Sequence, residues 1–447
     1  MPRTRSIHPD KEKRTMKIPT LRWLPAIIAA TSLTLAGCAG SGGSGEQSSS
    51  GLGEIPTDTN ATVRVLMENV PDTDIVKGLV GQFNQKYPGI KVEIETMTFD
   101  QMRDRLVSSF QASQPAYDLI VVDNPWMDDF ADAGFLEPLN DRIAATPDYR
   151  PDDFFDSLTA ITDVEGTTYG VPFYNYALGY IYNTGDLTAS GQSVPTDLGA
   201  LVTTSQRLKT ADRAGIAMQP QRGYKIFEEW ANWLFAAGGS IYGEDGKPSL
   251  DTPEAARALD AYIETYRTAA PANSLSWGFD EAFRSVSSGM AASMIGYNWN
   301  LPALNDPEGA SAQRAGQFAL APIPGGKSAL GLWSWAIPAN SGAADAAWAF
   351  TSWVTSPEID AQRVADGGAV IRKGSLTDPK VLADGYGADY YKTVGEILAD
   401  AAPLTEGKGG EEMIQVVGTE LNDAAAGNKS VADALRDAQA AAERIQQ

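Results

Sequence analysis

Residues 62–97 read TVRVLMENVPDTDIVKGLVGQFNQKYPGIKVEIETM, and this stretch decides the fold class. Residues 62–70 are apolar and rich in β-branched side chains, which predicts a buried strand. Residues 74–87 repeat apolar side chains at three- and four-residue steps, which predicts a helix with one apolar face. Residues 90–97 alternate apolar and polar side chains and predict a second strand. The order strand, helix, strand is the first unit of an α/β domain.

Two further elements extend this unit. Residues 99–111 have helical spacing, and residues 117–122 (YDLIVV) are an apolar run that predicts a third, buried strand. Alternating strands and helices imply a parallel sheet covered by helices on both faces. Ligands bind at the carboxyl ends of the strands in such sheets. We therefore single out polar and aromatic residues that follow the three strands: Glu68, Asn69, Asp100, Asp123 and Trp126.

The N-terminal segment has the pattern of a secretory signal. Basic Lys17 and Arg22 precede an apolar run over residues 24–35, which is too short for a membrane span of about 20 residues. The run closes in the tetrapeptide LAGC, ending at Cys38, which resembles the lipobox of bacterial lipoproteins. This resemblance implies that residues 1–37 are a signal peptide that is removed. It also implies that Cys38 is acylated and anchors the protein to the extracytoplasmic face of the cell membrane.

Residues 38–56 are dominated by glycine and serine, which predicts a flexible, lipidated tether before the folded part. Met1 and Met16 both remain candidate start residues, because a signal beginning at Met16 retains its basic and apolar regions.

Charge and composition exclude several function classes. The chain carries 35 Lys and Arg against 57 Asp and Glu; residues 1–37 hold seven and two of these, which leaves 28 against 55 and a net charge of −27. A surface this acidic repels nucleic acid, so we expect no nucleic-acid partner. The only histidine, His8, lies in the signal, and the only cysteine is Cys38. We therefore expect no metal, no cofactor and no thiol chemistry in the folded part.

Five stretches resemble the extracellular solute-binding proteins of bacterial ABC importers, in particular family 1, the sugar-binding, maltose-binding-protein-like family. They follow the family's order and cover the chain from about residue 62 to its end. The stretches are YDLIVVDNPWMDDFADAGFLEPL (117–139), GVPFYNYALGYIYNTGDL (170–187), WSWAIPANSGAADAAWAFTSWVTSP (333–357), the turn at 367–379 and the last turn at 421–439.

The resemblance implies a two-lobed, periplasmic-binding-protein-like type II fold with a ligand cleft between the lobes. Lobe one would comprise residues 57–173 plus 318–375, and lobe two residues 178–315 plus 376–447. It further implies a monomer without enzyme activity that captures a carbohydrate (a sugar, oligosaccharide or polyol). The protein would deliver this ligand to the permease subunits of an ABC transporter.

Tight sugar binding needs aromatic planes for the ring faces and polar groups for the buried hydroxyls. Alternation places Tyr174 and Tyr176 on one face of the segment that crosses between the lobes. Residues 289–300 (GMAASMIGYNWN) resemble a strand of the family that ends at the cleft. The remaining expected ligand-binding residues, each of which could instead have a structural role, are Tyr174, Tyr176, Trp230, Tyr297, Trp299, Trp333 and Arg372.

Two alternatives stay open. The first is a binding protein for a non-sugar solute. The second is a lipid-anchored enzyme that acts on glycosides, since a pair of carboxylates can hydrolyse a glycosidic bond without histidine. A pair of this kind has little specificity as a signal in a chain with 57 Asp and Glu residues.

Overall fold

The strand, helix and strand predicted within residues 62–97 are confirmed in the computed structural model, which describes residues 54–112 and 115–446. They form β1 (Ala61–Glu68), α1 (Pro71–Lys86) and β2 (Ile90–Met97). Proline in the first turn of α1 and acidic side chains beside it favour a helix start at this point. The next two predicted elements follow as α2 (Phe99–Phe110) and β3 (Leu119–Asp123).

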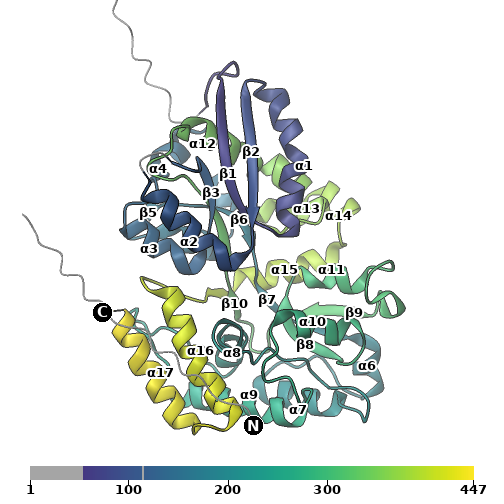
Figure 1. Cartoon of the computed structure of the whole chain (residues 1–447). Coiled ribbons are helices and arrows are strands. Elements are labelled where there is room, and N and C mark those ends of the chain that lie inside the picture. The colour runs from purple at the N-terminus through teal and green to yellow at the C-terminus, as the bar shows by residue number, and fades with distance from the viewer. Residues whose placement is uncertain (1–53, 113–114, 447) are drawn as a thin grey trace, which may run out of the picture. The chain divides into compact units, whose positions relative to one another are not determined.

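The sheet of the first lobe has five strands in the order β2-β1-β3-β11-β6 (Figure 1). β1 pairs in parallel with β2 and β3, as predicted, while β11 (Leu332–Ala336) runs antiparallel to both of its neighbours, β3 and β6 (Val171–Asn175). The remaining elements of this lobe are α3 (Asn124–Asp132), α4 (Asn140–Ala145), α5 (Asp156–Thr162), β4 (Asp163–Val164), β5 (Thr167–Thr168), α12 (Ala344–Val354), α13 (Pro357–Ala365) and α14 (Pro379–Asp384).

The second lobe is built on a three-stranded antiparallel sheet in the order β8-β7-β9. Its strands are β7 (Leu178–Asn183), β8 (Ser293–Tyr297) and β9 (Phe318–Ala321). Its helices are α6 (Thr184–Ala189), α7 (Leu198–Leu208), α8 (Tyr224–Ala236), α9 (Pro253–Thr268), α10 (Phe279–Ser287), α11 (Asn300–Asn305), α15 (Ala388–Ala399), α16 (Gly410–Ala426) and α17 (Val431–Ile445).

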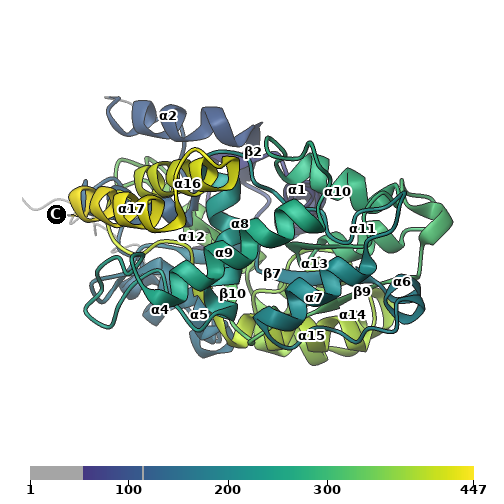
Figure 2. The ribbon, with the colours of Figure 1, turned by 90° about the horizontal axis from the view of Figure 1, so that it is seen from below.

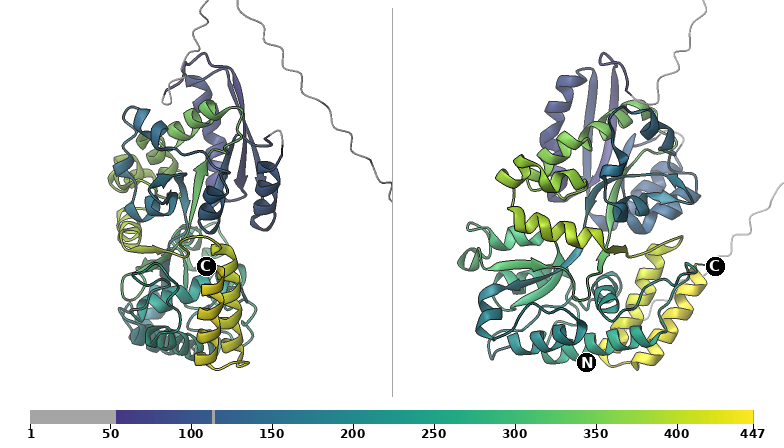
Figure 3. Two further views of the ribbon diagram at one scale, coloured as in Figure 1. Left: turned by 90° about the vertical axis from the view of Figure 1, so that its left-hand side faces the viewer. Right: turned by 180° about the vertical axis from the view of Figure 1, so that it is seen from behind.

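The helix α8 forms the core of this lobe, because it packs against both α9 and α16 (Figure 2). Its residues 226–235 are all buried. α16 packs in turn against α17 at the C-terminal end of the chain (Figure 3). Ser430 caps the start of α17, where its side chain accepts a hydrogen bond from the Asp433 N–H.

Two predicted lobe boundaries are wrong. β9 is hydrogen-bonded to β7, and β10 (Ser328–Leu330) pairs with β12 (Ala401–Pro403), so residues 318–330 go with the second lobe. The second segment of lobe one therefore begins with β11 rather than at residue 318. This lobe boundary depends on which strands pair over long sequence separations, and a local sequence pattern does not predict such pairing. The predicted start of the second segment of lobe two at residue 376 is too early as well, because α14 packs against α13 of the first lobe. The remaining lobe boundaries stay a prediction.

The chain crosses between the lobes at residues 175–178 and 330–332, and the two crossings touch. The Tyr176 N–H donates a hydrogen bond to the Gly331 carbonyl at 3.0 Å. The ring of Tyr176 lies directly over Gly331, where a Cβ would be 1.8 Å from Tyr176 Cζ. Only glycine leaves room for this ring, which the crossing thereby holds at the base of the cleft.

Candidate ligand-binding cleft

A cavity of about 760 Å³ lies between the two lobes. The first lobe contributes the ends of β1 and β3, the start of α2 and part of β11 to its lining. The second lobe contributes the first turn of α8, the end of β8, the start of α10 and one residue of α16. A cavity of about 770 Å³ elsewhere is lined only by residues between 140 and 172 of the first lobe. Of these two cavities, the cleft cavity is the one that both lobes line.

The first lobe presents an aromatic wall to this cavity. Phe99 stacks on Trp126 with ring centroids 5.3 Å apart and an interplanar angle of 26°. Trp333 meets both rings edge-on, at 6.1 Å from Phe99 and 5.3 Å from Trp126. Phe99 and Trp333 line the cavity, whereas Trp126 is buried behind them. Its Nε1–H donates to Glu411 of the second lobe at 3.4 Å, so Trp126 supports the wall rather than forming its surface.

The second lobe presents an opposing set of rings. Tyr297 and Trp299 stack with centroids 5.3 Å apart and planes only 17° from parallel. Phe279, at the start of α10, lies 4.9 Å from Tyr297. Flat rings on both sides of a cleft suit a ligand with apolar faces, such as a sugar ring. The Nε1–H of Trp299 is buried and has no acceptor among the described residues.

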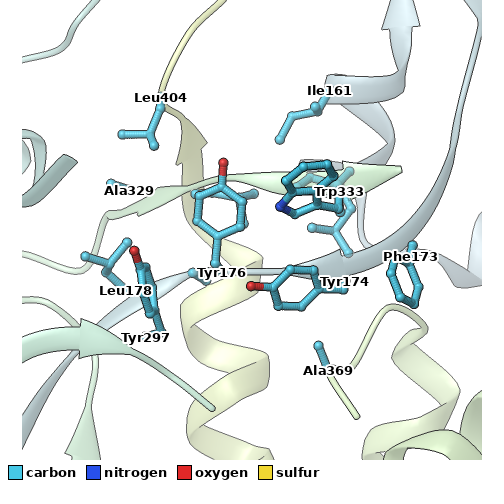
Figure 4. Close-up of a cluster of buried hydrophobic side chains, with 14 of the residues drawn as sticks. Ile161, Phe173, Tyr174, Tyr176, Leu178, Tyr297, Ala329, Trp333, Ala369 and Leu404 are labelled. Atoms are coloured by element: carbon cyan, nitrogen blue, oxygen red, sulfur yellow. The ribbon is translucent and has the colours of Figure 1, made fainter. Parts of the chain in front are cut away.

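The crossing segment contributes two further rings at the base of the cavity (Figure 4). Tyr174 and Tyr176 both line it, which confirms that alternation puts them on one face. The Tyr176 hydroxyl donates to Asp123 Oδ1 at 2.7 Å and lies 3.1 Å from the hydroxyl of Tyr224 on α8. Asp123 also caps α3, where Oδ1 accepts from the Asn124 N–H at 3.0 Å. A chain of polar groups thus runs from lobe one through the crossing to lobe two.

The lysine of the cavity has close carboxylate and hydroxyl partners, whereas burial raises the pKa of two of the carboxyl groups. Lys225 on α8 donates to Glu228 at 2.9 Å and to the Tyr297 hydroxyl at 2.6 Å, so this cation is already neutralised. Burial raises the pKa of Glu68 to about 7, and the attraction of Lys225 only partly opposes this. The pKa of Asp123 is also raised, and burial is the largest cause. The carboxylates of Glu68 and Glu411 act in the same direction, and the hydrogen bond from Tyr176 acts against them.

Most of the predicted binding residues meet in this cavity. Seven of them line it: Glu68, Asp123, Tyr174, Tyr176, Tyr297, Trp299 and Trp333. Asn69 is exposed beside the cavity, and Trp126 is in the layer behind its wall. Asp100 is in the first turn of α2, but its side chain lies outside the described part of the chain, and so does Cys38. That the seven bind ligand stays a prediction.

Two predicted residues are not in the cleft. Trp230 is fully buried in the core of the second lobe and does not line the cavity, although Tyr224, Lys225 and Glu228 of the same helix do. Arg372 is fully buried within the first lobe, where it donates to the Thr355 carbonyl at 2.6 Å and the Tyr149 carbonyl at 2.9 Å. Its guanidinium lies 3.9 Å from the ring centre of Phe154. Backbone carbonyls and a ring therefore occupy the donors that were expected to meet ligand.

Several lining residues were missed by sequence reasoning. Phe99 follows β2 at a position to which the strand-end rule points, but it was not among the expected binding residues. The group at the start of α8 carries no motif, and only the fold brings it to the cleft. The missed residues of the lining include Phe99, Gln221, Tyr224, Lys225, Glu228, Phe279, Asp280, Glu281 and Gln415.

Two α/β lobes joined by crossing strands, with an aromatic cleft between them, define the class of proteins that bind a small molecule by closing upon it. No group of side chains among residues 54–112 and 115–446 has the composition of a metal site. Within the same residues no helix has the length and apolar character needed to span a membrane. The fold and the cleft therefore describe a ligand-binding protein.

Residues 69–361 match the model of the family "Bacterial extracellular solute-binding protein", and the chain belongs to this family. It is 28% identical over 309 residues to the mannitol-binding protein of Pseudomonas aeruginosa, covering 66% of this chain and 69% of that protein. It is 22% identical over 356 residues to a probable amino-acid ABC transporter periplasmic-binding protein of Sinorhizobium fredii, covering 78% and 81%. A solute-binding protein of Agrobacterium radiobacter K84 in complex with ribitol superposes with a TM-score of 0.76 at 25% identity, over 87% of this chain and all of that one. The two-lobed fold predicted from the sequence is thus confirmed.

Proposed function

We propose that this protein captures a carbohydrate (a sugar, oligosaccharide or polyol) outside the cell and delivers it to the permease of an ABC transporter. The observation that carries the proposal is the pair of facing aromatic walls, Phe99 with Trp333 and Tyr297 with Trp299, around a cavity that both lobes line. Polar groups at the rim and base, among them Glu68 and Asp123, can accept hydrogen bonds from hydroxyls. Relatives that bind mannitol and ribitol support the class of ligand.

The mechanism that follows is a shift between an open and a closed arrangement of the lobes. A solute that touches both aromatic walls interacts with more surface in the closed arrangement, and this difference favours closure. The closed protein then presents one face of each lobe to the permease. The role is binding rather than catalysis: Asp123 caps a helix and accepts from Tyr176, and the family is one of solute-binding proteins.

The lipid anchor is a separate part of the proposal. Acylation at Cys38 would hold the folded lobes on the extracytoplasmic face of the membrane, close to the permease. Expression with a labelled fatty acid tests this: we expect label on the wild type and none on the Cys38→Ala variant. An unlabelled wild-type protein that is found free outside the cell would refute the anchor and leave the binding function standing.

Thermal melting against a panel of sugars, polyols and oligosaccharides tests the binding function. A ligand at a hundredfold excess over its dissociation constant adds about 2.7 kcal/mol to the free energy of unfolding. Amino acids belong in the same panel, because one relative is named as a probable amino-acid binding protein. A stabilising amino acid together with inert carbohydrates would replace the proposed ligand class with this second candidate.

A further inference from the structure

The cleft does not end at the cavity described above. A second cavity of about 570 Å³ begins at Tyr174 and Trp299, which line both cavities. The wall of this second cavity comes from the start of α1 in the first lobe, from α11 in the second lobe and from the segment at the start of α15. It is therefore also enclosed by both lobes, and a ligand that fills it would contribute to closure in the same way.

The partition between the two cavities carries an unsatisfied donor. The Nε1–H of Trp299 is buried without an acceptor among the described residues, although the indole ring itself is fixed by stacking on Tyr297. Buried N–H groups in native proteins are nearly always hydrogen-bonded, so an unpartnered one needs an explanation. The indole N–H groups of Trp230, Trp233 and Trp335 are also unpartnered, but only that of Trp299 belongs to a side chain that lines both cavities. Its position on a side chain shared by both cavities points to a ligand that passes this residue.

The outer wall of the second cavity is an exposed aromatic ring. Tyr386 is 48% exposed, and only Met290 and Leu382 join it as exposed large hydrophobic residues in the part of the chain that the structure describes. It meets the ring of Tyr390 edge-on at 5.5 Å, and about half of its own surface stays accessible. A tyrosine that keeps its ring in water at the mouth of a cavity is a suitable surface for a sugar ring to stack on.

The charges of the second cavity are mostly neutralised. Asp72 lines it, but its carboxylate is buried against Arg363 at 2.6 Å and accepts from the Ala369 N–H at 2.9 Å. Asp306 is exposed at the rim and is the other carboxylate of the lining. Aromatic rings, prolines and one exposed carboxylate are a surface for a neutral, hydroxylated group rather than for an anion or a strongly basic one.

We propose that the ligand of this protein is an oligosaccharide of at least two rings, which extends past Trp299 so that a ring stacks on Tyr386. This inference rests on the proposed function and narrows its ligand class. The first cavity alone is within the size range of about 300–1,000 Å³ that holds a whole small ligand. A single-ring sugar or a polyol such as mannitol would leave the second cavity, the Trp299 N–H and the Tyr386 face without a role.

Calorimetric titration of the purified protein with saccharides of increasing length tests the inference. The probes are glucose, maltose and maltotriose, with the matching xylose and cellulose series, and with mannitol and ribitol as single-unit polyols. We expect at least a tenfold gain in affinity from one ring to two or three in one series. Tyr386→Ala should remove most of that gain and leave the affinity for the single ring unchanged. Met290→Ala, which also truncates an exposed apolar side chain, should change neither affinity.

The outcomes separate the two proposals. A monosaccharide or polyol that binds as tightly as its longer relatives would overturn the inference and leave the proposed function intact, and so would an equal loss for all lengths in the Tyr386 variant. No binding by any carbohydrate, from a protein that melts cooperatively, would overturn the proposed function and with it the inference.

Discussion

Glu68 offers the sharpest test of the cleft as a binding site, because its carboxylate is held where it is unfavourable for folding. Its pKa is about 7, compared with an ordinary value of 4.5, because the side chain is largely removed from water. A carboxyl whose pKa is higher in the folded than in the unfolded state binds protons preferentially when folded. The free energy of unfolding must then fall as the pH rises from about 4.5 to about 7.

Glu68→Gln removes this titration and keeps the shape of the side chain. A pKa difference of about 2.5, at about 1.36 kcal/mol for each pKa unit, corresponds to about 3 kcal/mol. We expect the variant and the wild type to be similarly stable at pH 4.5. At pH 8 we expect the variant to be more stable by up to about 3 kcal/mol. Urea unfolding without ligand at the two pH values measures this difference, and Glu412→Gln on the exposed side of α16 is the control with the same loss of charge.

The same variant should bind carbohydrate more weakly, because a carboxylate accepts hydroxyl hydrogen bonds more strongly than an amide does. Higher stability combined with weaker binding is the mark of a residue kept for function at a cost in stability. A stability difference that is the same at both pH values would refute the assignment of a raised pKa to Glu68. Unchanged affinity in the variant would refute its contact with the ligand.

The other cleft residues give three further predictions. Trp333→Ala should abolish carbohydrate-induced stabilisation in thermal melts. The control is Trp348→Ala in the core of the first lobe, which should lower the free energy of unfolding by about 3–5 kcal/mol and leave the affinity of the folded protein unchanged. Tyr176→Phe removes a donor from the buried Asp123 carboxylate and should cost about 1–3 kcal/mol in urea unfolding, and a neutral result would show that Asp123 is protonated or solvated there. Gly331→Ala places a methyl group on the Tyr176 ring, so we expect loss of ligand-induced compaction in small-angle scattering; normal compaction would show that the crossing can yield.

Many elements of the first lobe could be predicted because the patterns that specify them lie within short stretches of the sequence. The strand periods and the helix spacing within residues 62–122 gave elements within a few residues of those observed, and the strand-end rule placed Glu68 and Asp123 correctly. The antiparallel strand β11 could not be predicted in the same way, since it returns from the second lobe and pairs with β3 and β6 across long sequence separations.

The second lobe's contribution to the site was harder to predict for a different reason. An amphipathic helix shows which face is apolar, but residues 226–235 of α8 are all buried, so the pattern of the helix does not tell Trp230 in the core from Tyr224 at the cleft. Arg372 illustrates the same limit for a charged residue, because its guanidinium donates hydrogen bonds to backbone carbonyls within its own lobe. Both errors arise from burial that depends on packing between distant segments.

The arrangement around Tyr176 joins ligand contact to lobe geometry. This residue is part of the crossing that touches Gly331, its ring lines the cleft, and its hydroxyl lies between Asp123 of one lobe and Tyr224 of the other. A rotation of the lobes must change at least one of these contacts, because the groups belong to different rigid elements. A solute that displaces or completes the Asp123–Tyr176–Tyr224 contacts would therefore alter the balance between open and closed lobes directly. If the solute contacts Tyr176 as proposed, ligand binding and lobe closure depend on one side chain, and a substitution at Tyr176 should change affinity and compaction together.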